Sequence, residues 1–489
     1  MSRVRTAIAA VILGILLPAP PAVAAEPAAP PLAWGPCSDV GSRLECATVQ
    51  VPLDHADSGG PSIDLAISRL RAADPSRRRG VLLVNPGGPG GSGLGLPEYI
   101  AQLLAGHPQV LQEFDLIGFD PRFVGRSSPA TCGLVGEDIA ILRWPGAAGF
   151  PAEVAQARSI ARRCAAHAGW AIPYATTADS ARDLDLIRAA LGERRLSYLG
   201  YSYGTTLARA YVTLFPHRVD RFVLDSNTDP TVSGRENLRA FGPNFERMLW
   251  LFASSAARND ARYGLGRDAR TVRQVVDELV ARAEDEPLPV GEEIFTAAEL
   301  RTLIFRMLYA ENRFDYLGRF LGIVRAGQPL PADLAFMMNA GRWDTPPPAP
   351  ADNAVAAYFL VTCADDRWPT EVARYRAEHV ADSRTYPFFG PAAANISPCA
   401  FWPEVDRSRM RSFTGSRVPV LLINSVGDPA TPYPGALATR RMMPNARLVT
   451  VPVSHHAVFG EYPNACVEEA AVGYLLSGRL PVRDLTCPA

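Results

Sequence analysis

The sequence predicts an α/β fold in which a mostly parallel sheet is covered by helices on both faces and interrupted by a helical cap. Three observations lead to this prediction. Short apolar runs alternate with amphipathic stretches in the first half of the chain, a long helix-rich segment follows, and two further apolar runs come after it. Short, wholly apolar runs are typical of parallel strands that are buried on both faces.

Composition excludes some classes of partner. The chain has 489 residues, of which 48% are hydrophobic and 20% charged, as in an ordinary globular protein with an ample core. Its formal net charge of -1 gives no electrostatic reason to expect nucleic acid or an anionic membrane surface. We therefore expect no nucleic-acid partner.

Residues 1–24 are predicted to be a secretory signal. Two arginines precede an apolar stretch from Ala7 to Leu17, and Ala22-Val23-Ala24 supplies the A-x-A cleavage site. The apolar stretch is too short to span a bilayer comfortably, so we expect no stable membrane span after cleavage. A retained N-terminal anchor is the alternative. The protein is predicted to be secreted or associated with the cell wall.

The elements follow in order along the chain. Strands are expected at Leu44–Leu53, Ile63–Leu70, Val81–Val84, Phe114–Phe119, Leu196–Leu199, Arg221–Leu224, Val418–Ile423 and Arg447–Val451. Helices are expected at Asp179–Leu191, Val272–Glu284, Ala297–Tyr309 and Tyr316–Val324. The predicted organisation is a flexible Ala- and Pro-rich segment (25–36), the first part of the core (37–235), the cap (236–391, broken by the Pro-rich loop Thr345–Pro350) and the C-terminal part of the core (392–489).

A nucleophile motif follows one of these strands. The pentapeptide Gly200-Tyr201-Ser202-Tyr203-Gly204 lies between the apolar run that ends at Leu199 and a helix-like stretch from Thr205 to Phe215. Strand, G-x-S-x-G and helix in this order predict an elbow that exposes Ser202 at a helix N-terminus. Because a serine hydroxyl is a poor nucleophile, it requires a base, an orienting acid and an oxyanion hole.

The base and the acid have candidates in the last part of the chain. Asp428 comes just after the strand that ends at Ile423, and the next strand is followed by His455 and His456. Each of these residues alone is also compatible with an ordinary loop position. The order Ser, Asp, His is the order in the α/β-hydrolase fold, and it predicts a triad of Ser202, Asp428 and either His455 or His456.

The oxyanion hole is expected to combine two backbone N–H groups. One belongs to Tyr203, directly after the nucleophile, and the other to Gly88, in the glycine-rich loop Asn85–Gly93 that follows an early strand. A phosphate cradle is disfavoured because this loop lacks the G-x-x-x-x-G-K-[ST] pattern. A plain tight turn remains the other interpretation.

Eight cysteines suit an exported protein. An even number in an oxidising compartment suggests four disulfides, although eight cysteines allow 105 connectivities. We favour pairing between sequence neighbours: Cys37–Cys46, Cys132–Cys164, Cys363–Cys399 and Cys466–Cys487. No C-x-x-C is present, which disfavours zinc and redox sites, and the predicted chemistry needs neither a metal nor a cofactor.

Four motifs together resemble a known family. They are Asn85-Pro86-Gly87-Gly88-Pro89-Gly90-Gly91-Ser92-Gly93, Gly118-Phe119-Asp120-Pro121-Arg122, Gly200-Tyr201-Ser202-Tyr203-Gly204-Thr205 and Gly427-Asp428-Pro429-Ala430-Thr431-Pro432. This set is similar to that of the secreted tripeptidyl aminopeptidases of actinobacteria, which belong with the prolyl-aminopeptidase-like α/β-hydrolases. The resemblance runs from about Trp34 to Cys487. It implies a capped serine exopeptidase that releases tripeptides or dipeptides from peptide or protein substrates with free N-termini.

The resemblance also bears on single residues. It implies Ser202 as nucleophile and Asp428 as orienting acid. The family's histidine is flanked by glycines, and the corresponding His455-His456-Ala457-Val458-Phe459-Gly460 favours His456, while the lost glycines keep His455 open. Phe123 stands where the family has glycine after Asp-Pro-Arg, and we expect this bulky side chain to narrow the pocket.

An aminopeptidase must also recognise the ammonium group of its substrate. This calls for a carboxylate in a partly desolvated pocket, where charge-assisted hydrogen bonds are strong. The candidates are Glu236 at the entry to the cap and Asp365 or Asp366 after Cys363.

Two alternatives remain open at the level of sequence. A secreted esterase or lipase would use the same triad, because esters and amides pass through the same kind of tetrahedral intermediate. A non-catalytic binding protein of the cell envelope would use the scaffold alone, which an intact triad disfavours. The sequence makes no prediction of the oligomeric state.

Overall fold

A computed structural model describes residues 32–37, 39–146, 149–291, 293–334, 349–405 and 415–489. The predicted signal (1–24) lies outside the described residues, as do residues 25–31 of the predicted flexible segment 25–36. The end of that segment is partly ordered, because β1 (Gly35–Pro36) pairs with the second strand of the sheet.

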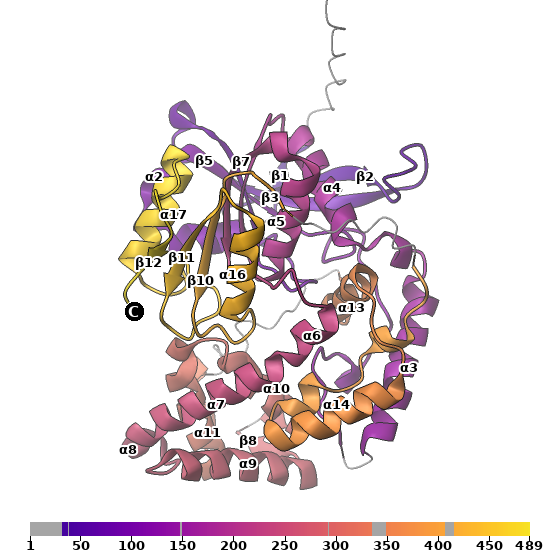
Figure 1. Cartoon of the computed structure of the whole chain (residues 1–489), viewed down its shortest axis with the longest axis vertical. Helices are drawn as coiled ribbons and strands as arrows, with labels where there is room; N and C mark the ends of the chain where they lie inside the picture. The colour runs from indigo at the N-terminus through magenta and orange to yellow at the C-terminus, as the bar shows by residue number, and fades with distance from the viewer. Residues whose placement is uncertain (1–31, 38, 147–148, 292, 335–348, 406–414) are drawn as a thin grey trace, which may run out of the picture.

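The described residues contain a sheet of ten strands in the order β1-β2-β3-β5-β4-β6-β7-β10-β11-β12 (Figure 1). After β1 the strands are β2 (Glu45–Pro52), β3 (Ser62–Leu70), β4 (Gly80–Asn85), β5 (Phe114–Phe119), β6 (Leu196–Tyr201), β7 (Val219–Asp225), β10 (Leu421–Ser425), β11 (Arg447–Val451) and β12 (Leu485–Thr486). The pairs from β1 to β5 are antiparallel, and every pair from β5 onward is parallel. The predicted mostly parallel sheet is confirmed.

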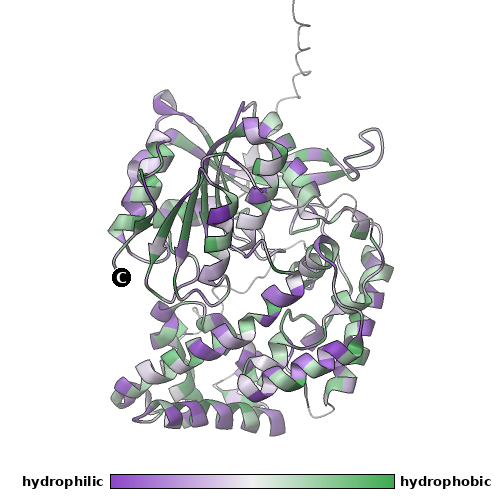
Figure 2. Ribbon diagram, in the orientation of Figure 1, coloured by the Kyte–Doolittle hydropathy of each residue, from purple (hydrophilic) through white to green (hydrophobic). Residues whose placement is uncertain are grey.

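Alternate residues of each central strand face opposite sides of the sheet, as the pleat requires. In β4, Val81 and Leu83 belong to one apolar cluster and Leu82 and Val84 to another. The first cluster is covered by α4 (Thr177–Ala190), α5 (Tyr203–Leu214) and α16 (Tyr433–Met442), and the second by α1 (Leu96–Leu103), α2 (Pro108–Glu113) and α17 (Ala465–Ser477). Figure 2 shows the strands as largely hydrophobic, which explains why they could be recognised from sequence.

A helical cap is inserted between β7 and β10. Its described helices are α6 (Gly234–Arg239), α7 (Phe241–Arg258), α8 (Asp260–Tyr263), α9 (Ala269–Asp285), α10 (Ala297–Met307), α11 (Phe314–Ala326), α13 (Asn353–Asp365), α14 (Val372–Thr385) and α15 (Gly390–Ala393), with a hairpin of β8 (Leu288–Val290) and β9 (Glu293–Phe295). Helices α7, α9, α10 and α11 bury a core of their own. The three predicted cap helices are confirmed, while residues 345–348 of the predicted loop Thr345–Pro350 lie outside the described residues.

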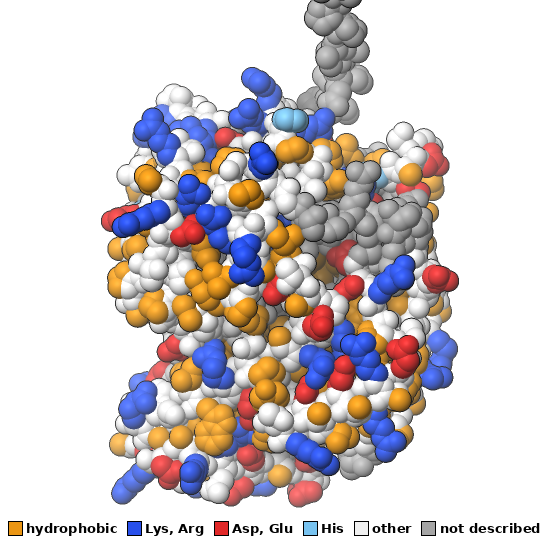
Figure 3. Space-filling model, viewed as in Figure 1, with side chains coloured by type: hydrophobic (Ala, Val, Ile, Leu, Met, Phe, Trp, Pro, Cys, Tyr) orange, Lys and Arg blue, Asp and Glu red, His pale blue; other side chains and the backbone are white. Residues whose placement is uncertain are grey.

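The charges on the surface agree with the formal net charge of -1. On the face shown in Figure 3, charged side chains of both signs are interspersed over the cap and the core. None of the helices in the described ranges is long and apolar enough to cross a membrane.

All four predicted disulfides are confirmed: Cys37–Cys46, Cys132–Cys164, Cys363–Cys399 and Cys466–Cys487. Two of them lie near α13. The Cys132–Cys164 disulfide joins a loop of the core to α3 (Gly149–Ala168). The Cys363–Cys399 disulfide joins α13 itself to the short helix η6 (Pro398–Phe401). Four disulfides indicate folding in an oxidising, extracytoplasmic compartment.

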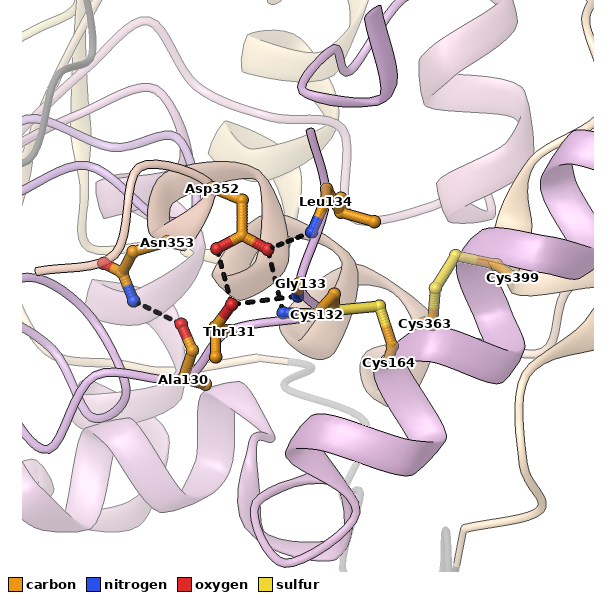
Figure 4. Close-up of a disulfide and its surroundings, with 10 residues drawn as sticks. All are labelled: Ala130, Thr131, Cys132, Gly133, Leu134, Cys164, Asp352, Asn353, Cys363 and Cys399. Carbon is orange, nitrogen blue, oxygen red and sulfur yellow. Dashed lines mark hydrogen bonds between the residues drawn. A yellow bond between two sulfur atoms is a disulfide. The ribbon is translucent and has the colours of Figure 1, made fainter. Parts of the chain in front are cut away.

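A buried carboxylate completes this attachment of α13 (Figure 4). Asp352, just before the helix, accepts hydrogen bonds from the Thr131 hydroxyl and from the backbone N–H groups of Cys132 and Leu134, at 2.7–2.9 Å. Its neighbour Asn353 donates to the carbonyl of Ala130. The first turn of α13 is thereby fixed to the loop that carries the Cys132 disulfide.

The expectation that Phe123 narrows the pocket is wrong. Phe123 has a φ of 70°, in the left-handed region where glycine is favoured. Its side chain is buried in the core and meets the ring of Trp170 edge-on at 5.2 Å. Its ring therefore lies in the core, and Phe123 is not among the residues that line the main cavity.

Replacing Asp352 tests how much the attachment of α13 to the Cys132 loop contributes to the stability of the fold. Asp352→Ala leaves the buried N–H groups of Cys132 and Leu134 without their acceptor, and we expect the free energy of unfolding to fall by about 3 kcal/mol, measured by chemical denaturation. The matched control is Asp268→Ala. Asp268 also accepts three hydrogen bonds near a helix start but is exposed, so the loss should be clearly smaller. Equal losses would show that burial of the Asp352 network adds nothing.

Candidate active site

Ser202 lies in a sharp turn between a strand and a helix. It follows β6, precedes α5 and has φ 56° and ψ -122°, a conformation that non-glycine residues rarely adopt. Its backbone N–H donates to the carbonyl of Asp225 on the neighbouring strand at 3.0 Å. A Cβ on Gly204 would lie 2.8 Å from the Asn85 Oδ1, so glycine is needed for the helix to begin this close to β4.

The glycine-rich loop after β4 lies directly against this turn. A Cβ on Gly87 would lie 2.5 Å from the Tyr201 carbonyl oxygen and 3.1 Å from the Tyr203 nitrogen. Gly88, Ser202 and Tyr203 line the same cavity. The backbone N–H groups of Gly88 and Tyr203 donate to no acceptor in the described part of the chain. Neither N–H group is used within the described structure, as an oxyanion hole would require.

Asp428 and His456 meet at the carboxyl ends of β10 and β11. The His456 Nδ1 lies 2.9 and 3.0 Å from the two Asp428 oxygens. Thr431 donates to the same carboxylate from its N–H and its hydroxyl, both at 2.8 Å. Burial works to raise the pKa of Asp428, but the charge of His456 and these hydrogen bonds outweigh it and hold the pKa below its ordinary value. The carboxylate is therefore suited to orient the imidazole.

His455, the other candidate base, lies away from the carboxylate. Its Nδ1 is 2.9 Å from the carbonyl oxygen of His456, and its ring packs against Tyr462. Burial lowers its pKa to about 4. His456 lines the cavity and His455 does not, so the geometry favours His456 as the partner of Asp428.

One large cavity joins these groups. It has a volume of about 1820 Å³ and lies between the ends of the strands and the cap. Ser202 and His456 line it from the core, and the cap adds an aromatic wall that includes Phe241, Phe305 and Tyr309. The Tyr309 and His456 rings meet edge-on at 5.3 Å. A site of this size encloses far more than the reacting atoms of a substrate.

The three candidate residues for an ammonium group lie in different surroundings. Asp365 and Asp366, at the end of α13, line the cavity. Burial raises the pKa of Asp365 to about 7 in spite of two hydrogen bonds from Thr177. Glu236 is not among the residues that line the cavity: it accepts hydrogen bonds from Ser233 in a capping box at the start of α6.

The sequence did not point to Asp225. This carboxylate at the end of β7 is fully buried, and its Oδ2 accepts hydrogen bonds from Val458 N–H at 2.8 Å and Phe459 N–H at 2.6 Å. Burial raises its pKa to about 7, against the effect of these hydrogen bonds. Asp225 therefore fixes the chain just after His456. Thr431 was also missed, although a threonine three residues after an aspartate is a common turn signal.

No metal-binding cluster of three or more His, Cys, Asp or Glu side chains occurs in the described ranges. The residues at the cavity offer a serine hydroxyl, an imidazole hydrogen-bonded to a carboxylate, and two backbone N–H groups without an acceptor in the described part of the chain. This set is the one that nucleophilic acyl transfer requires.

Comparison with known proteins supports the same chemistry. The family model described as alpha/beta hydrolase fold matches residues 80–462. A tripeptidyl aminopeptidase of Streptomyces lividans is 34% identical over 472 residues, which cover 93% of this chain and 86% of that protein. The serine protease Hip1 of Mycobacterium tuberculosis is 29% identical over 488 residues, covering 94% and 91%. Carboxylesterase B of Mycobacterium tuberculosis is 33% identical over 488 residues, covering 94% and 90%.

The raised pKa of Asp225 predicts how stability depends on pH. The pKa is about 7 in the folded protein and near 3.8 ordinarily, so the folded state holds the proton more tightly and loses stability as the pH rises between these values. Asp225→Asn removes this titration and keeps an acceptor for the two N–H groups. We therefore expect the melting temperature of Asp225→Asn minus that of the unchanged protein to increase from about pH 5 to about pH 8, because only the unchanged protein loses stability in that range.

Asp183→Asn is the contrasting variant. Burial disfavours the Asp183 carboxylate, but the Arg122 guanidinium outweighs this and lowers the pKa. The melting-temperature deficit of this variant should stay constant from about pH 5 to about pH 8 and shrink only below about pH 4. The same trend in both variants would contradict the assignment for Asp225.

Proposed function

Since this chain belongs to the tripeptidyl aminopeptidase family of α/β-hydrolases, a group of serine peptidases, we propose that it is a secreted exopeptidase that releases tripeptides or dipeptides from free N-termini. The observation that carries the proposal is the capped cavity, which Ser202, His456, Asp365 and Asp366 line, together with the Asp428–His456 hydrogen bond. The tripeptide product is suggested by the name of the Streptomyces lividans relative.

The proposed reaction is acyl transfer in two steps. His456 takes the proton of the Ser202 hydroxyl as its oxygen attacks the scissile carbonyl carbon, and Asp428 holds the imidazolium that forms. The N–H groups of Gly88 and Tyr203 donate to the oxyanion. His456 then gives the proton to the departing amine. Water, activated by the same imidazole, hydrolyses the acyl-enzyme and frees Ser202.

The cap gives the proposed reaction its exopeptidase character. Helix α13 contributes several residues to the lining of the cavity, and Asp365 and Asp366, at its C-terminal end, are among them. We assign the substrate ammonium to these two carboxylates rather than to Glu236, which caps α6. A buried, ionised carboxylate would form a strong charge-assisted hydrogen bond with the ammonium.

An esterase is the second candidate, and one specific observation favours it. Carboxylesterase B of Mycobacterium tuberculosis is similar over nearly the whole chain. A non-catalytic binding protein is disfavoured by the Asp428–His456 hydrogen bond and by the cavity that Ser202 and His456 both line. The extracytoplasmic location indicated by the disulfides supports secretion, in agreement with the signal expected in residues 1–24.

Replacement of the nucleophile tests the reaction type. We expect Ser202→Ala to lower turnover by about 10⁴-fold or more, with an unchanged melting temperature, because the change removes only the attacking oxygen. A fluorophosphonate probe should label the unchanged protein and not the variant. Retained turnover in Ser202→Ala would refute the assignment.

Substrate class is tested with one panel. Aminoacyl-, dipeptidyl- and tripeptidyl-arylamides with free or acetylated N-termini would be compared with short acyl esters. We expect the highest kcat/KM on a dipeptidyl or tripeptidyl arylamide with a free N-terminus. Turnover of the esters alone would favour the esterase.

The assignment of the ammonium site makes a separate prediction. Asp365→Asn and Asp366→Asn should each reduce the preference for free over acetylated peptides by about tenfold or more, because one charge-assisted hydrogen bond is lost. Glu236→Gln should keep the preference. Because the pKa of Asp365 is about 7, kcat/KM for the free peptide, divided by that for an acyl ester, should fall as the pH drops below that value. An unchanged preference in both Asp variants would contradict the site while leaving the hydrolase intact.

A further inference from the structure

The cap does more than cover the cavity, because it forms hydrogen bonds with the loop that carries His456. The backbone N–H of His456 donates to the carbonyl of Tyr309 at 2.9 Å. Ala310 pairs with His455 in an antiparallel bridge. The Ser454 N–H donates to the Glu311 carboxylate at 2.6 Å, and the Glu311 N–H donates back to the Ser454 carbonyl. The cap therefore contacts the histidine loop through one isolated β-bridge and the hydrogen bonds on either side of it.

A second cap element reaches both loops that carry the acid and the base. Arg247, in the middle of α7, donates from Nη2 to the carbonyl of Gly427 and from Nη1 to the Ser454 hydroxyl at 3.3 Å. Gly427 directly precedes Asp428, and Ser454 lies two residues before His456. One guanidinium thus bridges the two loops.

The loop of Asp428 and the loop of His456 pack closely, so a small displacement of one against the other would change the geometry of the acid–base pair. A Cβ on Gly427 would lie 2.4 Å from the Ser454 Oγ, and the Gly427 N–H donates to Val453 at 2.9 Å. The Asp428–His456 hydrogen bond, at 2.9 Å, depends on this separation. Misplacement of a reacting group by about 1 Å costs about 100-fold in rate.

Arg247 is half-buried close to two carboxylates. Its side chain is half-buried, which lowers its pKa, while the carboxylates of Glu311 and Asp428 work in the opposite direction. A planar guanidinium donates to two acceptors in a fixed geometry, whereas a lysine ammonium keeps the charge and its donors but holds them less rigidly. The same helix contributes Phe241 to the cavity wall, so α7 connects the wall of the cavity to the two loops.

We infer that Arg247 is a positioning residue, which holds the Asp428 loop against the His456 loop from the cap and so sets the alignment of the acid–base pair. The cap is then a part of the catalytic apparatus, and its seating on the core determines the rate of the chemical step. This inference rests on the proposed function, in which His456 is the base and Asp428 its orienting acid.

The test compares three variants in the full-length protein. Arg247→Met keeps the length of the side chain and removes both hydrogen bonds, Arg247→Lys keeps the charge and one donor group, and Arg258→Met makes the same chemical change at an exposed position of the same helix. The measurements are kcat and KM on the best peptide arylamide, and both the rate and the end point of fluorophosphonate labelling.

We expect kcat of Arg247→Met to fall by about 10- to 100-fold while KM stays within about twofold, because alignment is lost and the substrate cavity is kept. The labelling rate should fall in parallel, with the same fraction of molecules labelled at the end. Arg247→Lys should recover part of kcat, and Arg258→Met should behave as the unchanged protein.

Three results would overturn the inference. They are an unchanged kcat in Arg247→Met, a loss of kcat that the labelled fraction accounts for in full, and a Lys variant no better than the Met variant. Ser202→Ala separates this inference from the proposed function. If Ser202→Ala keeps its turnover, the proposed reaction is wrong; if it is inactive while Arg247→Met is fully active, only the positioning role is wrong.

Discussion

Strands β4, β6, β7, β10 and β11 run parallel, so their carboxyl ends lie at one edge of the sheet, and every group proposed to take part in the reaction starts from that edge. The glycine loop follows β4, Ser202 follows β6, and Asp428 and His456 follow β10 and β11. The register of the strands brings together residues that are far apart in sequence. The buried Asp225 at the end of β7 then joins the turn of Ser202 to the loop of His456 through its backbone and its side chain.

Three aspartates, Asp225, Asp365 and Asp428, differ in their hydrogen-bonding partners. Asp428 has the imidazole and Thr431 as partners, and its pKa is lowered. Asp225 and Asp365 have only uncharged donors in hydrogen-bonding contact, and burial raises the pKa of each to about 7. At neutral pH the side chain of Asp428 is therefore ionised, whereas those of Asp225 and Asp365 are partly protonated. The presence of a cationic partner decides between these states.

Much of this arrangement is readable in the sequence, and the exceptions have physical causes. Phe114–Phe119 and Arg447–Val451 were predicted to the residue, because short runs of mostly apolar residues are typical of strands buried on both faces. The two-residue strands β1 and β12 are too short to leave such a pattern. The choice of His456 over His455 depends on which side of the loop each ring faces, which chain order does not encode.

The remaining differences come from contacts made across the fold. Glu236 was a candidate for substrate binding, yet Ser233 and Glu236 have the spacing of a capping box, a local signal that explains the glutamate without a ligand. Phe123 was expected at the pocket, but its ring is buried in the core against Trp170. Arg247 gives no local signal at all, since an arginine on an amphipathic helix is ordinarily a solvated residue.

The cap leaves the sheet after β7 and returns at β10, and these two strands are direct neighbours. The ends of the insertion are therefore held side by side whatever lies between them, and its length and composition can change during evolution without moving the strands. Such freedom would let new substrate preferences arise by exchange of the insertion alone. The hydrogen bonds from Arg247 and Glu311 set a limit on that freedom, because an exchanged cap would have to supply equivalent donors and acceptors to the same two loops.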